Sequence, residues 1–565
     1  MGIQDFRLGL QVLKFNFKSI IVPILYVIGL LHWYLFLNYN SPTFTSGDWH
    51  VGHQLFDVFK QALITGKIPF HATLYATGSP ESTLYGSIRF LGMPWIVMPP
   101  LLFLLKFFSI PVFYTCQFWL YYTISFIVVL KWTKKLNLST SASVFLLILF
   151  NFYGALVSKA SAGQTIWGYM LIPWFLWIIY KFIENDKPSR SKSLMIMLEF
   201  SFLLFFLLLS GDMHNFYQFV LVGFCVLIFY PNRILSFVSG TLIGIVLSAW
   251  YFVPNILFSA YTSSVLLPVG HWRRRGILGY GFQNGDSGVP LLEYSRDMPE
   301  ITKILIHSIN ILNHLWESLT HSFNPSHENV WEYNLYISYL GVVLIIGSLI
   351  ALFIRYKPLS MKDLIRYKPL SMKDLIRYKP LSMKDLMLRV KDLMLRVKDL
   401  MEPYRLLGGA IIVILLAIGK YNYKLIKFFQ SIYPFNPIDA IPSRLMLYPF
   451  GMVLLISSLG FDSMFKIFPE KIRPFLKWIL LFLLLMLLMQ HSYKWWLIQA
   501  NAIMIDQFQG EFKTTIYDNI DDGFYKAIVI ISYLSSIITV SCGGFFYLWL
   551  KRHENNKLLP ELNGS

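Results

Sequence analysis

The sequence predicts an all-α membrane protein, a polytopic transmembrane helical bundle with about twelve spans and both termini in the cytoplasm. Three features support this: 55% hydrophobic residues, only 14% charged residues, and apolar runs of nearly 20 residues that recur along the 565-residue chain. Soluble proteins carry about 25% charged residues, and about 20 apolar residues suffice for one helical span. The runs are continuous rather than alternating, which excludes a transmembrane barrel.

The first span is expected at 19–38, because basic residues precede an apolar run too long for the core of a signal peptide. The run 88–107 has two interpretations, a crossing helix or a segment along the outer interface. Three prolines interrupt it, and a crossing would place the basic stretches 131–137 and 184–193 outside, against the positive-inside rule. We therefore expect 88–107 to lie on the outer face. The remaining spans are expected at 112–130, 142–158, 166–182, 194–210, 215–230, 234–252, 336–353, 406–420, 445–461, 476–490 and 526–550.

The chain divides into three parts. Residues 1–353 form a transmembrane core with two large outer loops, 39–111 and 253–335, and residues 406–565 form the C-terminal transmembrane helices. Between them, 354–405 is a basic cytoplasmic loop, in which "IRYKPLSMKDL" occurs three times and "MLRVKDL" twice. We interpret these repeats as a duplicated linker on anionic lipid headgroups, with a partner-binding array as the alternative. The net charge of +18 reflects the positive-inside rule, and no module for nucleic acid accompanies it.

The candidate chemistry begins just after the first span, in "TSGDWHVGHQLF". Asp48 has two possible roles: a general base or divalent-cation ligand, or a solvated acid that caps the helix beginning near residue 51. His50 and His53 lie three residues apart and share a helical face, so they form with Asp48 a possible three-ligand site for Mg²⁺ or Mn²⁺.

The stretch 47–94 resembles the first outer loop of the multi-spanning glycosyltransferase C superfamily, which includes oligosaccharyltransferase catalytic subunits and protein O-mannosyltransferases. The resemblance is carried by Asp48 after the first span, by "LITGKIPF" (63–70) and by the turn "LYGS" (84–87). Shorter similarities lie at 160–174, 209–218, 247–255, 331–341 and 441–450. At 163–164 the chain has Gly-Gln where relatives often have Gly-His. The resemblance implies juxtamembrane helices on the outer face in this first loop.

The resemblance implies that Asp48 acts as base or metal ligand while a sugar moves from a polyprenyl-phosphate carrier to an acceptor. Asp212 and Glu332 face the same side in the expected topology and are candidates for a second acid; the alternative for each is a solvated carboxylate at a helix end. A phosphate leaving group calls for a cation nearby. Arg444 is the first candidate, and the outer-loop run Arg273, Arg274 and Arg275 is the second, with lipid headgroups as its alternative ligand.

The function expected is therefore that of an integral-membrane glycosyltransferase with a polyprenyl-phosphate-linked sugar donor, a glycan, lipid or protein acceptor, and surrounding membrane lipids as partners. We expect it in the plasma (inner) membrane rather than an organelle membrane. Two alternatives stand beside it: a flippase or transporter of lipid-linked glycans, and a non-catalytic assembly partner. A transporter should place charges or broken helices at mid-membrane. Glu199 is the one clear charge that the sequence places inside a predicted span, which favours the enzyme.

Overall fold

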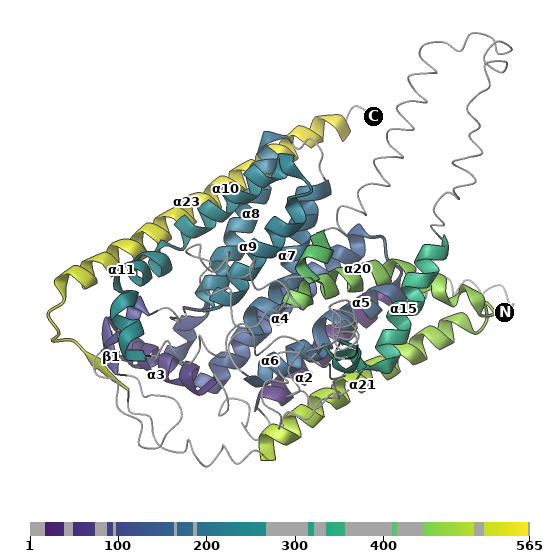
Figure 1. Ribbon diagram of the computed structural model, residues 1–565, viewed down its shortest axis with the longest axis horizontal. Helices are drawn as coiled ribbons and strands as arrows, with labels where there is room; N and C mark the ends of the chain where they lie inside the picture. The colour runs from purple at the N-terminus through teal and green to yellow at the C-terminus, as the bar shows by residue number, and fades with distance from the viewer. Residues whose placement is uncertain are drawn as a thin grey trace, which may run out of the picture.

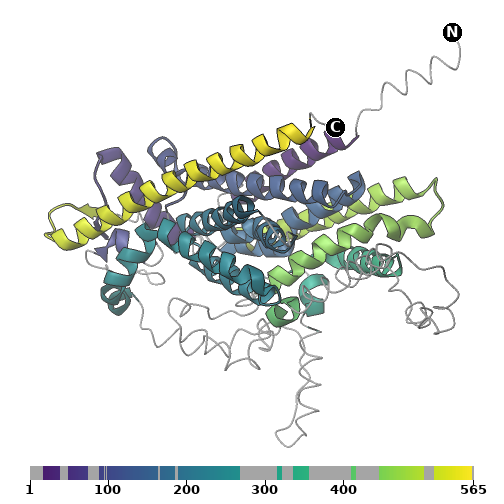
Figure 2. The ribbon, with the colours of Figure 1, turned by 90° about the horizontal axis from the view of Figure 1, so that it is seen from above.

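The computed structural model describes residues 17–38, 49–73, 88–93, 96, 98–162, 166–184, 189–266, 313, 315–320, 335–355, 409–414, 445–501 and 514–562. Helices dominate this part of the chain and run roughly alongside one another (Figures 1 and 2). Among the described residues, 8 helices are long and apolar enough to cross a membrane, or up to 9 if one bent pair is a single span. The protein is therefore a polytopic helical membrane protein.

The helices that build the bundle follow the chain in order. Their bounds are α2 Phe17–Asn38, α3 Trp49–Thr65, α4 Ile110–Lys135, α5 Thr140–Phe152, α6 Gly154–Ala162, α7 Ile166–Glu184, α8 Arg190–Leu209, α9 Met213–Leu227, α10 Pro231–Leu247, α11 Ala249–Leu266, α15 Ser338–Arg355, α20 Leu447–Met464, α21 Arg473–Asn501 and α23 Gly523–Leu562. Three short 3-10 helices complete the helical part, η2 Phe90–Gly92, η3 Leu102–Lys106 and η7 Phe465–Ile467.

Local sequence sets where several helices begin. Ser139 accepts a hydrogen bond from the amide of Ala142 at the start of α5, and Ser189 accepts one from Lys192 at the start of α8. Proline in the first turn of α4 and α10 needs no hydrogen-bonded amide there. Gly211, with φ of 71°, lets the chain turn sharply between α8 and α9.

Two predicted spans are broken. The span expected at 142–158 consists of α5 and α6, which separate at Tyr153, where the backbone is extended. The span expected at 234–252 falls in α10 and the first residues of α11, and the chain bends by 74° between these two helices, at Ser248. The sequence predicted neither break, because the apolar pattern shows no interruption at either position.

The run 88–107 forms no α-helix in its described residues. It contains the strand β2 (Ile88–Arg89), η2 and η3 instead. The amide of Phe90 donates to the carbonyl of Phe70 at 2.8 Å, which holds the run against the loop that precedes it. The described residues thus place this segment in the first loop rather than across the bundle.

The all-α prediction omitted a small antiparallel sheet with the strand order β2-β1-β3, where β1 is His71–Thr73 and β3 is Thr515–Tyr517. His71 pairs with Arg89 on one side and with Tyr517 on the other. The sheet joins the first loop to the segment before the C-terminal helix α23, which runs along one side of the bundle beside α10 and α11 (Figure 1).

Helices α15 and α20 pack closely against each other. A Cβ built on Gly460 would lie 1.9 Å from the carbonyl oxygen of Ser348, so only glycine permits this approach. Aromatic rings fill much of the remaining core, for example Phe145 against Phe461 and Phe175 against Phe219. In a membrane, contacts of this kind replace the hydrophobic driving force that water supplies to soluble bundles.

Candidate functional site

Trp49, the first residue of α3, contacts three helices of the bundle. Its side chain is fully buried, and its indole Nε1 donates to the carbonyl of Ala160 on α6 at 2.8 Å. Its ring packs edge-on against Tyr114 and Trp167, with centroids 4.7 Å and 6.1 Å away. Because Trp49 is the residue after Asp48, these contacts fix the start of the predicted catalytic loop onto α4, α6 and α7.

Lys159, next to Ala160 on α6, is the basic side chain of this region that the sequence analysis missed. It is only 2% exposed, and its Nζ lies 5.5 Å from the centre of the Tyr169 ring. The stretch Thr140–Ser161 qualifies as a membrane span, so a lysine is buried within a span. The expectation that Glu199 is the one clear charge inside the spans was therefore wrong. Glu199 itself forms an ion pair with Lys181.

Asp212 is buried at the first residue before α9 and is surrounded by donors. Its Oδ2 accepts hydrogen bonds from the amide of Gly168 at 2.7 Å and from Nδ2 of Asn215 at 2.8 Å, and its Oδ1 accepts one from the amide of Asn215 at 3.1 Å. Burial raises the pKa of this carboxyl, while the hydrogen bonds from Asn215 and Gly168 oppose the rise. This geometry is that of a helix cap that also ties α7 to α9.

The same network continues into α20. The hydroxyl of Tyr448 lies 3.0 Å from Oδ1 of Asn215 and 3.1 Å from Oε1 of Gln218. Tyr448 follows Arg444 by four residues in the sequence. Buried polar groups thus run without interruption from α7 through α9 to α20.

The predicted site residues are only partly within the described chain. Asp48, Glu332, Arg444 and the run Arg273, Arg274 and Arg275 lie outside the described residues. His50 falls within α3, but its side chain is outside what the structure describes.

His53 is the described member of the predicted metal set. It lies half-buried on α3, where burial lowers its pKa and the neighbouring Asp57 and Lys60 act in opposite directions. A lowered pKa keeps the imidazole neutral, as a metal ligand requires. Among the described residues, no group of three histidine, cysteine or acidic side chains is placed to hold a metal ion.

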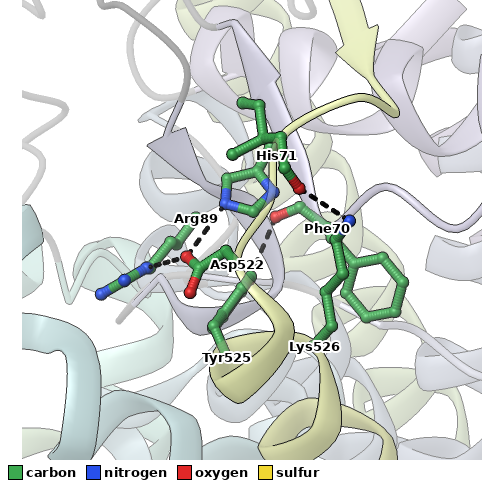
Figure 3. A network of polar contacts seen from close by, with 7 residues as sticks. Phe70, His71, Arg89, Asp522, Tyr525 and Lys526 are labelled. Carbon is green, nitrogen blue, oxygen red and sulfur yellow. Dashed lines mark hydrogen bonds and ion pairs between the residues drawn. The ribbon is translucent and has the colours of Figure 1, made fainter.

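A second polar cluster, the Asp522 network, consists of His71, Arg89 and Asp522 and joins the first loop to the start of α23 (Figure 3). Nε of Arg89 donates to Oδ2 of Asp522 at 2.7 Å, and Nε2 of His71 lies 3.3 Å from the same oxygen. The Arg89 guanidinium also lies 4.8 Å from the centre of the Phe258 ring and 5.4 Å from that of Tyr525. Arg89 is thus an ion-pair partner of Asp522.

The pKa values in this network move in the direction of a neutral histidine beside a charged acid. Burial by itself would raise the pKa of Asp522, but the hydrogen bonds and charges of Arg89 and His71 bring it below its usual value. Burial lowers the pKa of His71, and the hydrogen bond to Asp522 offsets that only in part. The network is therefore held chiefly by the Arg89–Asp522 pair.

Further contacts extend this connection along both segments. Nε2 of Gln61 donates to Asp57 at 2.9 Å and to the hydroxyl of Thr514 at 2.8 Å. The hydroxyl of Thr73 donates to that of Tyr517 at 3.0 Å. The hydroxyl of Tyr525 donates to the carbonyl of Phe70 at 3.1 Å, and Lys67 pairs with Asp518. Residues 514–526 are therefore joined to the first loop by several hydrogen bonds and an ion pair, although hundreds of residues separate the two segments in the sequence.

No protein-family model, curated protein or solved structure matches the chain. A functional proposal therefore rests on the contacts of the first loop and on the resemblance of its sequence.

Proposed function

We propose that the protein is an integral-membrane glycosyltransferase that moves a sugar from a polyprenyl-phosphate-linked donor to an acceptor hydroxyl at the outer face. The observation that carries the proposal is the buried position of Trp49, one residue after Asp48, against α4, α6 and α7. A base must be held firmly relative to its substrate, because small misplacements cost much of the rate. Trp49 supplies such an anchor.

In the proposed reaction, Asp48 accepts the proton of the acceptor hydroxyl as its oxygen attacks the anomeric carbon. The bond between that carbon and the phosphate oxygen breaks, and the polyprenyl phosphate leaves with the bonding electron pair. Displacement from the opposite face inverts the anomeric configuration. Arg444, or the run Arg273, Arg274 and Arg275, neutralises the charge that develops on the phosphate.

Asp212 and the metal ions take no step in this proposal. Asp212 accepts hydrogen bonds from Asn215 at the start of α9 and from the Gly168 amide on α7, so we assign it the role of holding α7 and α9 together. Of the three proposed metal ligands, only the His53 side chain is described. In the proposed reaction, Asp48 serves as the base.

The test is transfer of a radiolabelled sugar by membranes that contain Asp48→Asn. General bases contribute about 10²–10⁴-fold to a rate, so transfer should fall by at least about 100-fold while insertion into the membrane is unchanged. Asp57→Asn is the matched control, because Asp57 is another acid of the same loop and its carboxylate accepts hydrogen bonds from Gln61 and Thr514. Full activity of the Asp48→Asn variant would refute the assignment.

A transporter of lipid-linked glycans is the second candidate, and two observations favour it. The pair α10 and α11 is bent by 74°, and Lys159 is buried within a span. Broken helices and buried charges are the features by which transporters bind and pass their substrates. A transporter would move the intact lipid-linked glycan between the leaflets of a vesicle, whereas a transferase would cleave the bond between sugar and phosphate.

A further inference from the structure

The turn that joins α20 to α21 carries exposed lysines beside exposed apolar side chains. This hairpin tip, residues 465–475, contains η7 and the first residues of α21. Lys466 and Lys471 are both exposed. The exposed apolar side chains of the tip are Ile467, Phe468, Ile472 and Phe475. One candidate span ends at Ile467 and the next begins at Arg473, so the tip lies where the chain leaves the apolar core of the membrane.

The hairpin tip and the first loop lie at opposite ends of one span. In the span Thr140–Ser161, the hydroxyl of Ser141 donates to Oδ1 of Asp462 at 3.0 Å, close to the tip. Near the other end of that span, Ala160 accepts the hydrogen bond of Trp49. Figures 1 and 2 show the two regions at opposite ends of the bundle. With the first loop on the outer face, the tip faces the cytoplasm. Its three basic residues against one acid agree with the positive-inside rule.

Arg473 holds the hairpin tip in a fixed shape. Its Nε donates to the carbonyl of Phe468 at 2.6 Å, and its Nη2 donates to the carbonyl of Lys466 at 3.0 Å. The one acid of the tip, Glu470, is 90% exposed and lies 3.6 Å from Nη1 of Arg473. Within the described part of the chain, neither Lys466 nor Lys471 forms an ion pair with an acid. The tip thus presents two lysines on a turn that is already ordered.

We propose that the hairpin tip is a docking surface for the anionic phospholipids of the cytoplasmic leaflet. The apolar side chains of the tip enter the boundary between headgroups and acyl chains, and Lys466 and Lys471 donate to the lipid phosphates. Basic residues beside exposed apolar side chains are typical of segments that lie in this interface. The cytoplasmic leaflet carries the negative surface potential that attracts such lysines. The surface holds the inner ends of α20 and α21 and does not depend on sugar transfer.

The experiment places the full-length protein in phosphatidylcholine nanodiscs that contain a small share of a photoactivatable lipid. The probe is photoactivatable phosphatidylglycerol in one sample and photoactivatable phosphatidylcholine in the other. Peptide mapping by mass spectrometry then measures labelling of residues 465–475. Wild type should be labelled more by the phosphatidylglycerol probe. Lys466→Gln and Lys471→Gln should each lower that labelling by up to about fivefold, the equivalent of about 1 kcal/mol per lysine.

Matched variants separate a specific surface from a general effect of charge. Lys466→Arg keeps the charge and should be labelled like the wild type. Glu470→Gln removes the acid between the lysines and should raise labelling by the phosphatidylglycerol probe. Lys106→Gln changes an exposed lysine of the first loop, on the other side of the membrane, and should leave labelling of residues 465–475 unchanged.

A measurement on the unaltered protein completes the test. Raising the salt from about 0.1 M to about 1 M shortens the screening length from about 10 Å to about 3 Å. Labelling of the wild type by the phosphatidylglycerol probe should then fall toward that by the phosphatidylcholine probe. Equal labelling by the two probes at low salt would overturn the proposal. Wild-type labelling of a Lys466→Gln, Lys471→Gln double variant would overturn it as well.

Discussion

Replacing Asp522 with asparagine should loosen the sheet between the first loop and the C-terminal segment while the bundle stays folded. The change removes the charge that Arg89 Nε meets at 2.7 Å and weakens the acceptor that His71 faces at 3.3 Å. Hydrogen bonds to charged groups contribute about 1.5–3 kcal/mol when buried, and exposed ion pairs about 0–1 kcal/mol. The side chain of Asp522 is 17% exposed and that of Arg89 is 27% exposed. We therefore expect the sheet to lose about 1–2 kcal/mol of stability, a value between these two limits.

Hydrogen exchange followed by mass spectrometry measures this loss locally. A change of about 1–2 kcal/mol multiplies the population of the open sheet by about 5–30, so amides of 71–73 and 515–517 should exchange faster by that factor. Amides of α20 should be unaffected. The matched control is Asp518→Asn, whose ion pair with Lys67 is 40% and 49% exposed and should cost less than about 1 kcal/mol. Unchanged exchange in Asp522→Asn, or equal acceleration in the control, would show that the Arg89–Asp522 pair does not hold the sheet.

Three further predictions concern stability. Asp212→Ala should destabilise the protein by about 2–4 kcal/mol, because the variant loses the cap of α9 and leaves the Gly168 amide unpaired. The loss is measured as a lower thermal midpoint in detergent. Loss of sugar transfer by Asp212→Asn at an unchanged midpoint would instead show that Asp212 is catalytic. Gly460→Ala should lower the midpoint by forcing α15 and α20 apart, whereas Gly544→Ala, with nothing within 4 Å of its added Cβ, should not; equal midpoints would contradict the packing argument. Folding lowers the pKa of His71, so the contribution of His71 to the stability of the sheet is present above its unfolded pKa of about 6.5 and is lost as the pH falls. Acidification should therefore speed hydrogen exchange at the amides of 515–517 more in the wild type than in His71→Gln.

The sequence predicted the helices whose apolar runs are continuous. The first span was expected at 19–38 and α2 is Phe17–Asn38; a late span was expected at 445–461 and α20 is Leu447–Met464. Such runs are set by the thickness of the bilayer, so local composition is enough to find them. The helix α3 in the first loop was also expected, from the resemblance.

What the sequence could not predict depends on contacts between distant residues. The sheet pairs β1 with β3, and three-residue strands leave too short a pattern to recognise. Lys159 was missed because the predicted span ended at 158, one residue before it. The break at Tyr153 could not be predicted either, because it accompanies a contact with a distant residue: the amide of Gly154 donates to the carbonyl of Tyr336 at 2.7 Å. Asp212 had a capping alternative, and its donors come partly from α7, which no local pattern reveals.

The most direct test of the account is release of polyprenyl phosphate from a polyprenyl-phosphate-linked sugar by the purified protein in detergent micelles. Micelles have no compartments, so transport yields no product there, whereas transfer to an acceptor continues. For a glycosyltransferase, we expect the wild type to release the carrier and form a glycoside of inverted configuration, and Asp48→Asn to do neither. A wild type that leaves the donor intact in micelles but moves it across vesicles would contradict the account and establish a transporter.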